Sequence, residues 1–173
     1  MISKKMNKAL NDQIAMEGAA SQKYLALASW CANNGMDGGN LFFVNHSDEE
    51  RMHMTKIINY LWEVDGKAEI PAIEKPKHDY KNITEVIEAA YASEQAVTQS
   101  IYKLVGMALE EGDYQTHNFL QWYVSEQLEE EALMRKVLDK LKLIGSGDGH
   151  LYFIDEALSA ITAEEAEEEE ENT

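Results

Sequence analysis

Cysteine and proline are scarce in this chain of 173 residues. The single cysteine, Cys31, excludes an intrachain disulfide and a Cys-x-x-Cys metal site. The two prolines, Pro71 and Pro76, fall in one segment, which leaves long stretches on either side free to form helices. Alternating segments rich in Val and Ile are also missing, which argues against β-strands. Because Ala, Leu, Glu, Gln, Lys and Met are abundant, the composition predicts an all-α protein.

Long apolar runs and positive charges are scarce too. We expect neither a membrane span nor a signal peptide, and therefore a cytoplasmic protein. Only 15 basic residues stand against 32 acidic residues, and the net charge is −17. Such a chain repels phosphate groups and attracts cations, so we expect no nucleic-acid partner. The length predicts one domain, over residues 1–162, followed by an acidic, disordered tail at 163–173.

Apolar residues recur at helical spacing in four long segments and one short segment. The predicted helices are Ser3–Asn34, Asp37–Asp65, Asn82–Glu111, a fourth that follows Gly112-Asp113 and ends at Ile144, and a short fifth over Tyr152–Ile161. Residues 66–81 contain both prolines and no helical pattern. A helix of about 30 residues is roughly 45 Å long, and about 16 extended residues reach roughly 53 Å. This segment can therefore cross the length of a four-helix bundle, which would make the second and third helices parallel.

A Glu-x-x-His sequence lies in the middle of the second predicted helix, at Glu50-Arg51-Met52-His53. Residues three apart share a helix face, so the carboxylate of Glu50 and the imidazole of His53 can face one ion. That pair of ligand types suits a transition metal. The sequence alone is weak evidence, because exposed helices often carry Glu and His at this spacing. Glu17 and Glu94 interrupt the apolar faces of the first and third helices, and each alone is more typical of a boundary residue than of a ligand.

The two halves of the chain match at an offset of 77 residues, the separation of Gly35 and Gly112 at the tight turns. At this offset the matched pairs are Glu17 with Glu94, Glu49 with Glu126, Glu50 with Gln127, and His53 with Glu130. Antiparallel helices joined at these turns bring the matched residues to one level of the bundle. Buried carboxylates without partners are costly or take up protons, and bound cations remove that cost. The pattern therefore predicts a site for two metal ions, with Glu50 between them.

Three neighbours of this level have roles that the residues alone leave open. Tyr24 is either a core aromatic with its hydroxyl hydrogen-bonded, or an electron donor or hydrogen-bond donor beside the metals. His46, one turn before Glu50, is more typical of a core histidine or of one that supports a ligand. Trp122 is more typical of a packing residue.

An acidic group on the fourth helix has two interpretations. Glu126, Glu129 and Glu130 lie at positions i, i+3 and i+4, which is typical of a solvated face. Because Glu49 matches Glu126 at the offset, a third and more weakly held cation beside the pair is the other interpretation.

The sequence resembles the ferritins of the non-haem bacterial type over residues 4–161. The most telling stretch is Asn118-Phe119-Leu120-Gln121-Trp122-Tyr123-Val124-Ser125-Glu126-Gln127, followed by Glu129-Glu130. Ferritin-like di-iron bundles take one Glu from each of two helices and a Glu-x-x-His from each of the others. The resemblance implies a ferritin-like four-helix bundle with a long crossover, a short fifth helix and bound iron.

The resemblance also implies a role for each candidate residue. The first iron site would be formed by Glu17, Glu50 and His53. The second iron site would be formed by Glu50, Glu94 and Glu130, with Gln127 nearby. The third iron site would be formed by Glu49, Glu126, Glu129 and Glu130. Tyr24 and Trp122 match the aromatic residues beside the centre, and Tyr24 joins the residues expected to act in oxidation.

Two departures from related patterns refine these expectations. The second half carries Gln127-x-x-Glu130 in place of Glu-x-x-His, so the second iron should bind more loosely, as in a centre through which iron passes. Bacterioferritins carry a haem-ligating Met directly after the Glu of this motif, where this chain has Arg51, so we expect no haem. The fifth helix resembles that of the cage of 24 subunits and disfavours the mini-ferritins.

The function implied is iron storage with ferroxidase activity. Fe(II) would be oxidised to Fe(III) by O2 or H2O2 within each subunit, and ferric mineral would be stored inside a homo-oligomeric cage. An alternative is a di-iron oxidase or oxygenase that acts on an organic substrate, which would need a stable second metal site. A purely structural acidic bundle is a third possibility.

Overall fold

The computed structural model describes the backbone of residues 2–171 and the side chains as far as residue 167. Its helices are α1 (Lys4–Asn33), α2 (Asp37–Glu63), α3 (Ile83–Glu111), α4 (Tyr114–Ile144) and α5 (His150–Glu171). None of the described residues forms a strand, which confirms the all-α prediction. None of the helices in this part of the chain is both long and apolar enough to cross a membrane.

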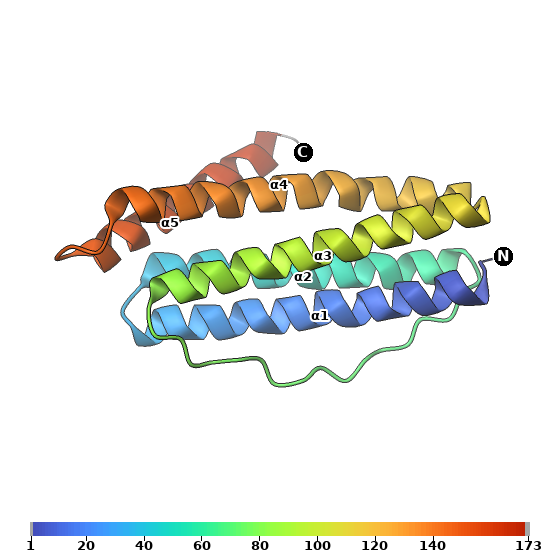
Figure 1. The fold of residues 1–173 in the computed structure, drawn as a ribbon, viewed down its shortest axis with the longest axis horizontal. Coiled ribbons are helices and arrows are strands. Elements are labelled where there is room, and N and C mark those ends of the chain that lie inside the picture. Colours follow the sequence, from blue (N-terminus) through green and yellow to red (C-terminus); the bar gives the residue numbers. More distant parts are fainter. Residues whose placement is uncertain (1, 172–173) are drawn as a thin grey trace.

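The four long helices form a bundle of two antiparallel pairs (Figure 1). α1 packs against α2, α3 packs against α4, and α1 also contacts α3. The segment between α2 and α3 runs along the outside of α1 for the length of the bundle, so α2 and α3 point the same way (Figure 1). This confirms the predicted long crossover.

Hydrogen bonds hold the crossover against α1 at both of its ends. Near its start, the backbone carbonyl of Lys67 accepts hydrogen bonds from the side-chain amides of Asn7 at 3.1 Å and Asn11 at 2.8 Å. Near its end, the indole Nε1 of Trp30 donates to the backbone carbonyl of Tyr80 at 3.0 Å. Side chains of α1 therefore satisfy backbone groups that no helix or sheet satisfies.

The helix ends follow the expected capping chemistry. Asn82 caps α3, its side chain accepting the Glu85 amide N–H at 3.0 Å. The Glu85 carboxylate in turn accepts the backbone N–H of Lys81 at 3.1 Å, one residue before the cap. Gly35 and Gly112, at the two tight turns, have φ of 71° and 66°. Both lie in the left-handed region that glycine adopts without a steric penalty.

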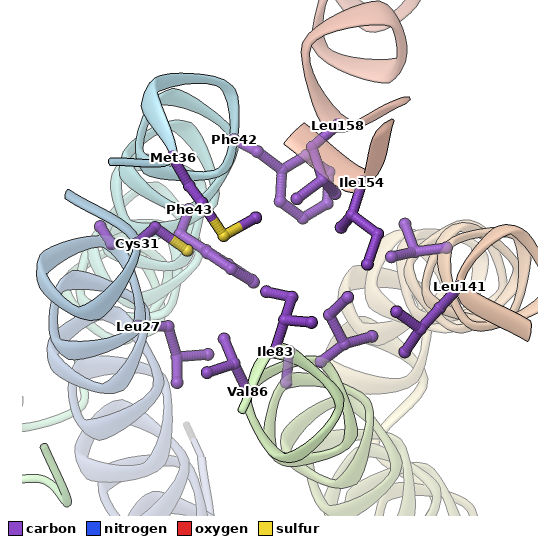
Figure 2. Close-up of a cluster of buried hydrophobic side chains, with 14 of the residues drawn as sticks. Leu27, Cys31, Met36, Phe42, Phe43, Ile83, Val86, Leu141, Ile154 and Leu158 are labelled. Carbon is purple, nitrogen blue, oxygen red and sulfur yellow. The ribbon is translucent and has the colours of Figure 1, made fainter. Parts of the chain in front are cut away.

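Two apolar clusters fill the bundle, one toward each end. The cluster at the α5 end includes Leu27, Phe43, Ile83 and Leu158 (Figure 2). The other cluster includes Leu10, Ile57, Leu104 and Leu120. Along each long helix the two clusters are separated by buried polar residues, which we call the carboxylate layer: Glu17, His46, Glu50, His53, Glu94, Gln127 and Glu130.

α5 is longer than the predicted helix over Tyr152–Ile161. It extends to Glu171, so residues 163–171, which we expected to be disordered, are helical in the structure. Residues 172 and 173 of that expected tail lie outside the described part. Ala and Glu are strong helix formers, and Lys136 of α4 binds Glu164 at 2.7 Å. Helix propensity and this contact explain why the acidic stretch continues α5.

Two glycines at the start of α2 allow α5 to pack closely. The backbone N–H of Gly39 donates to Oδ1 of Asp155 at 2.7 Å. A Cβ atom at Gly38 would lie 2.3 Å from Oγ of Ser159 and 2.4 Å from the backbone oxygen of Asp155. Only glycine therefore fits at this position while α5 keeps its place, and the Asp155 carboxylate lies where a helix N-terminus favours negative charge.

Candidate metal centre

The first part of the carboxylate layer joins α1 and α2. One ligand atom from each of Glu17, Glu50 and His53 can be chosen so that all three lie within 4.8 Å of one another. All three side chains are buried. Glu17 Oε1 accepts a hydrogen bond from Nε2 of Gln13 at 2.8 Å, and the backbone carbonyl of His53 accepts one from the Tyr123 hydroxyl at 2.7 Å. The first contact orients the Glu17 carboxylate, and the second fixes the backbone from which the His53 imidazole projects.

The second part of the layer is centred on Glu94 of α3. One of its carboxylate oxygens accepts the Tyr24 hydroxyl, and the other accepts Nε2 of Gln127 at 3.1 Å. Gln127 Nε2 also lies 3.4 Å from Oγ1 of Thr98. Tyr24 therefore contacts the layer directly, which the sequence had left open. Gln127 lies in the layer as a partner of Glu94, and its own Oε1 accepts no hydrogen bond from the described residues.

A second group of possible ligands contains His46, Glu49 and Glu130, again with ligand atoms within 4.8 Å of one another. Nε2 of His46 lies 3.7 Å from Oε2 of Glu130. Nδ1 of His46 lies 2.9 Å from the backbone oxygen of Phe42, which can only accept, so Nδ1 carries the proton. The other nitrogen of the neutral ring is then unprotonated and able to bind a cation.

For His46 the sequence predicts only a supporting or core role. Its position on the same helix face as Glu50 and His53 was the available signal. The atom that it presents depends on the carbonyl of Phe42, which periodicity does not reveal.

The remaining acidic candidates lie further out. Glu126 Oε1 is 4.0 Å from Nε2 of His53, and its side chain is 28% exposed. Glu129 is exposed to solvent. The structure thus brings Glu49 and Glu130 together with His46, whereas Glu126 lies on the His53 side and Glu129 at the surface.

Seven buried side-chain atoms have no hydrogen-bond partner among the described residues, and all seven belong to the carboxylate layer. They are Glu17 Oε2, His46 Nε2, Glu50 Oε2, His53 Nδ1, His53 Nε2, Gln127 Oε1 and Glu130 Oε2. Leaving a buried polar atom unpaired costs about 1–3 kcal/mol. The unpartnered carboxylate oxygens and imidazole nitrogens are atoms that bind cations, so the layer fits the binding of metal ions.

The electrostatics of the layer point the same way. Burial raises the pKa of Glu17 well above its ordinary value, and the nearby charge of Glu50 raises it further. Burial also raises the pKa of Glu50 and of Glu130, with the charge of Glu94 as the next cause for both. The raised pKa values indicate that several negative charges without a cation are unfavourable together in this layer. A cation relieves both causes, because it neutralises the carboxylates and binds them directly.

Aromatic residues line the His53 side of the layer. The rings of His53 and Trp122 meet edge to face with centroids 5.3 Å apart. Nζ of Lys56 lies 4.1 Å from the centroid of the Trp122 ring, on which it makes a cation–π contact. Trp122 therefore packs between an imidazole of the layer and a lysine.

Comparison with known proteins agrees with this geometry. The family model of the ferritin-like domain matches residues 7–144. The bacterial non-heme ferritin of Campylobacter jejuni is 45% identical over 93% of this chain and 96% of its own length. A probable bacterial non-heme ferritin-like protein of Haemophilus influenzae is 44% identical over 94% of this chain and 98% of its own length.

The fold has solved counterparts as well. The open-pore ferritin of the archaeon Archaeoglobus fulgidus superposes with a TM-score of 0.89 at 39% identity, covering 92% of this chain and 98% of that one. These similarities do not favour the alternative of an oxidase that acts on an organic substrate. With the matched domain, the sequence identities and the shared bundle all in agreement, the chain belongs to the ferritin family.

Proposed function

We propose that the carboxylate layer is the ferroxidase centre of this iron-storage ferritin, within a cytoplasmic, homo-oligomeric cage of 24 copies. Fe(II) binds there as a substrate, is oxidised, and leaves as Fe(III) to be stored as mineral inside the cage. One observation carries this proposal: seven unpartnered buried atoms, most of them carboxylate oxygens and imidazole nitrogens, gather in one layer of the bundle. In a purely structural bundle, buried polar atoms are expected to be hydrogen-bonded.

Two iron positions fit the ligand sets. We assign the first to Glu17, Glu50 and His53, whose ligand atoms lie close together. We assign the second to Glu50, Glu94 and Glu130, with Gln127 beside it, so that Glu50 serves both. Each Fe(II) gives one electron. Two together reduce O2 and two protons to H2O2, or reduce H2O2 and two protons to two molecules of water.

The chain's residues favour oxidation and release in different ways. Carboxylates are hard ligands and bind Fe(III) more strongly than Fe(II), so the layer favours the oxidised ion. At the second position the neutral amide of Gln127 takes the place of a carboxylate, which weakens retention there. Tyr24 holds Glu94 through its hydroxyl, and we propose it as an electron donor during oxidation.

A third cation position is proposed on the side of Glu49 and Glu130. Their ligand atoms lie together with that of His46, which supports an ion at this side. Glu126 and Glu129, which the family resemblance adds to this position, lie further from it and would approach only through side-chain movement.

The test is aerobic addition of Fe(II) to the metal-free protein. We expect oxidation much faster than in buffer, a large hollow particle by light scattering, and loss of fast oxidation in Glu17→Ala. Glu63→Gln, which alters an exposed acid of the same bundle, should oxidise iron like the parent. Oxidation at the buffer rate together with small particles would refute the proposal.

A further inference from the structure

A groove separates α2 from the C-terminal part of α5, the part that was not expected to be ordered. Its volume is about 410 Å³, and its acidic lining residues are Asp48 and Glu49 of α2 and Glu165 of α5. No lysine or arginine lines it within the described part of the chain. The groove is therefore a negatively charged cleft that favours cations.

The groove connects with the carboxylate layer through Glu49. Glu49 lines the groove, and its carboxylate also belongs to the group that includes His46 and Glu130. His46 is 2% exposed and Glu130 is 9% exposed, yet within the described part of the chain His46 Nε2 and Glu130 Oε2 have no hydrogen-bond partner. An incomplete set of buried ligands thus lies next to the acidic groove, with one carboxylate common to both.

We propose that this groove binds a hard cation and is the route by which Fe(III) leaves the layer. The ion would pass from His46, Glu49 and Glu130 to Asp48 and Glu165, and then to solvent along α5. The step is transfer between ligands, without change of oxidation state. This inference rests on the proposed ferroxidase function for the identity of its cargo. It assigns to α5 a role in iron transfer in addition to its packing role.

The choice of ion follows from the donor atoms. The groove offers carboxylate oxygens, which prefer hard cations such as Fe(III) or a lanthanide, and the single imidazole lies at its inner end. Asp48 is exposed and Glu165 is half-buried. Carboxylates in contact with water bind more weakly than the buried set, so an ion can move outward and be released.

The variant that tests the route is Asp48→Asn combined with Glu165→Gln, which removes two negative charges without changing side-chain size. The control is Glu63→Gln with Glu156→Gln, which removes two exposed charges from the same two helices outside the groove. Both variants should be compared with the parent cage, after circular dichroism has shown equal helix content.

The first measurement is recovery of the centre. Fe(II) is added aerobically at two ions per chain, and again after a delay. We expect the groove variant to oxidise the first addition like the parent. Before the second addition, the capacity for fast oxidation should return about fivefold more slowly in this variant than in the parent. That ratio of rates corresponds to roughly 1 kcal/mol of free energy. The control variant should recover like the parent. Equal recovery in all three proteins, or an equal delay in both variants, would overturn the proposal.

The second measurement uses Tb(III), a hard ion that is not oxidised or reduced here. Calorimetric titration of the metal-free cages should show weaker binding of one Tb(III) per chain in the groove variant only. Unchanged Tb(III) binding would count against the groove as a site. If the parent itself fails to oxidise Fe(II), the ferroxidase function fails, while the Tb(III) titration still decides whether the groove binds a hard cation.

Discussion

Nδ1 of His53 lies 3.6 Å from Oε2 of Glu50, and neither atom has a hydrogen-bond partner among the residues that the structure describes. A hydrogen bond between the two atoms would satisfy both of them. Because they face each other without forming that bond, we infer that they are arranged to bind an ion between them. We predict that His53→Ala loses most of the thermal stabilisation that Zn(II) confers on the metal-free parent, because ligand binding stabilises the folded state by mass action. The measurement is the unfolding temperature with and without Zn(II). His117→Ala, which removes a half-buried imidazole outside the carboxylate layer, should keep the full stabilisation, and an equal loss in both variants would contradict the assignment.

Gln127 holds Glu94 through a hydrogen bond of 3.1 Å. Gln127→Glu replaces this donor by a second carboxylate, so two buried acids face each other. We expect the metal-free variant to lose about 1–3 kcal/mol of stability. Because the new carboxylate can bind metal, Zn(II) should raise its unfolding temperature more than it raises that of the parent. Calorimetry with and without Zn(II) checks this, with Gln121→Glu on the exposed face as the control. The same Zn(II) effect in parent and variant would speak against Gln127 as a neighbour of the second ion.

Tyr24 donates its hydroxyl to Glu94 inside the bundle. Tyr24→Phe keeps the ring that packs against Phe43, with centroids 6.0 Å apart, and removes only the donor. One oxygen of Glu94 is then left unpaired, so the metal-free protein should lose about 1–3 kcal/mol. Urea unfolding measures this. Tyr102→Phe, at an exposed position of α3, should change stability by less than about 0.5 kcal/mol. Equal stability of Tyr24→Phe and the parent would mean that this hydrogen bond is not maintained in solution.

The carboxylate layer and the extent of α5 show where prediction from the sequence succeeded and where it stopped. Glu17 and Glu94 interrupt apolar helix faces, and bundle geometry brings such residues to one level, so their meeting could be predicted. The free nitrogen of His46 could not be predicted, because it depends on a carbonyl of its own helix. The helical state of residues 163–171 was missed because a run of like charges is typical of a solvated tail. Packing of Ile154 and Leu158, together with the Lys136 contact, anchors the preceding turns.

Gly38 allows α5 to approach α2, since a Cβ atom there would lie 2.4 Å from the backbone oxygen of Asp155. Backbone cannot rotate away as a side chain can, so Gly38→Ala should displace α5 and cost about 1–3 kcal/mol. Hydrogen exchange should show faster exchange of the amides of α5. Gly106→Ala is the control, because a Cβ atom there meets nothing within 4 Å. In the interior of α3 that change should stabilise the protein by about 0.5–1 kcal/mol. Opposite signs for the two substitutions are the expected result, and destabilisation by both would contradict it.

Cys31 is fully buried, and burial, with the Asp155 charge as a lesser cause, raises its pKa to about 12. An unfolded cysteine ionises near a pKa of about 8.5. Above that pH the unfolded chain loses the thiol proton while the folded chain keeps it, so the contribution to stability is complete at lower pH and is lost as pH rises toward 12. The loss amounts to about 1.4 kcal/mol per pH unit for this one group.

Urea unfolding of the parent and of Cys31→Ala at pH 8, 9 and 10 isolates this effect, because all other groups titrate alike in both proteins. We expect the parent to lose more stability than Cys31→Ala over this range. At pH 8, a thiol reagent should modify the unfolded parent rapidly and the native protein very slowly, because the thiolate is the reactive form and the raised pKa keeps the folded thiol protonated at this pH. If the parent and Cys31→Ala lost stability equally over this pH range, Cys31 would have the same pKa in the folded and the unfolded chain, which would contradict the prediction.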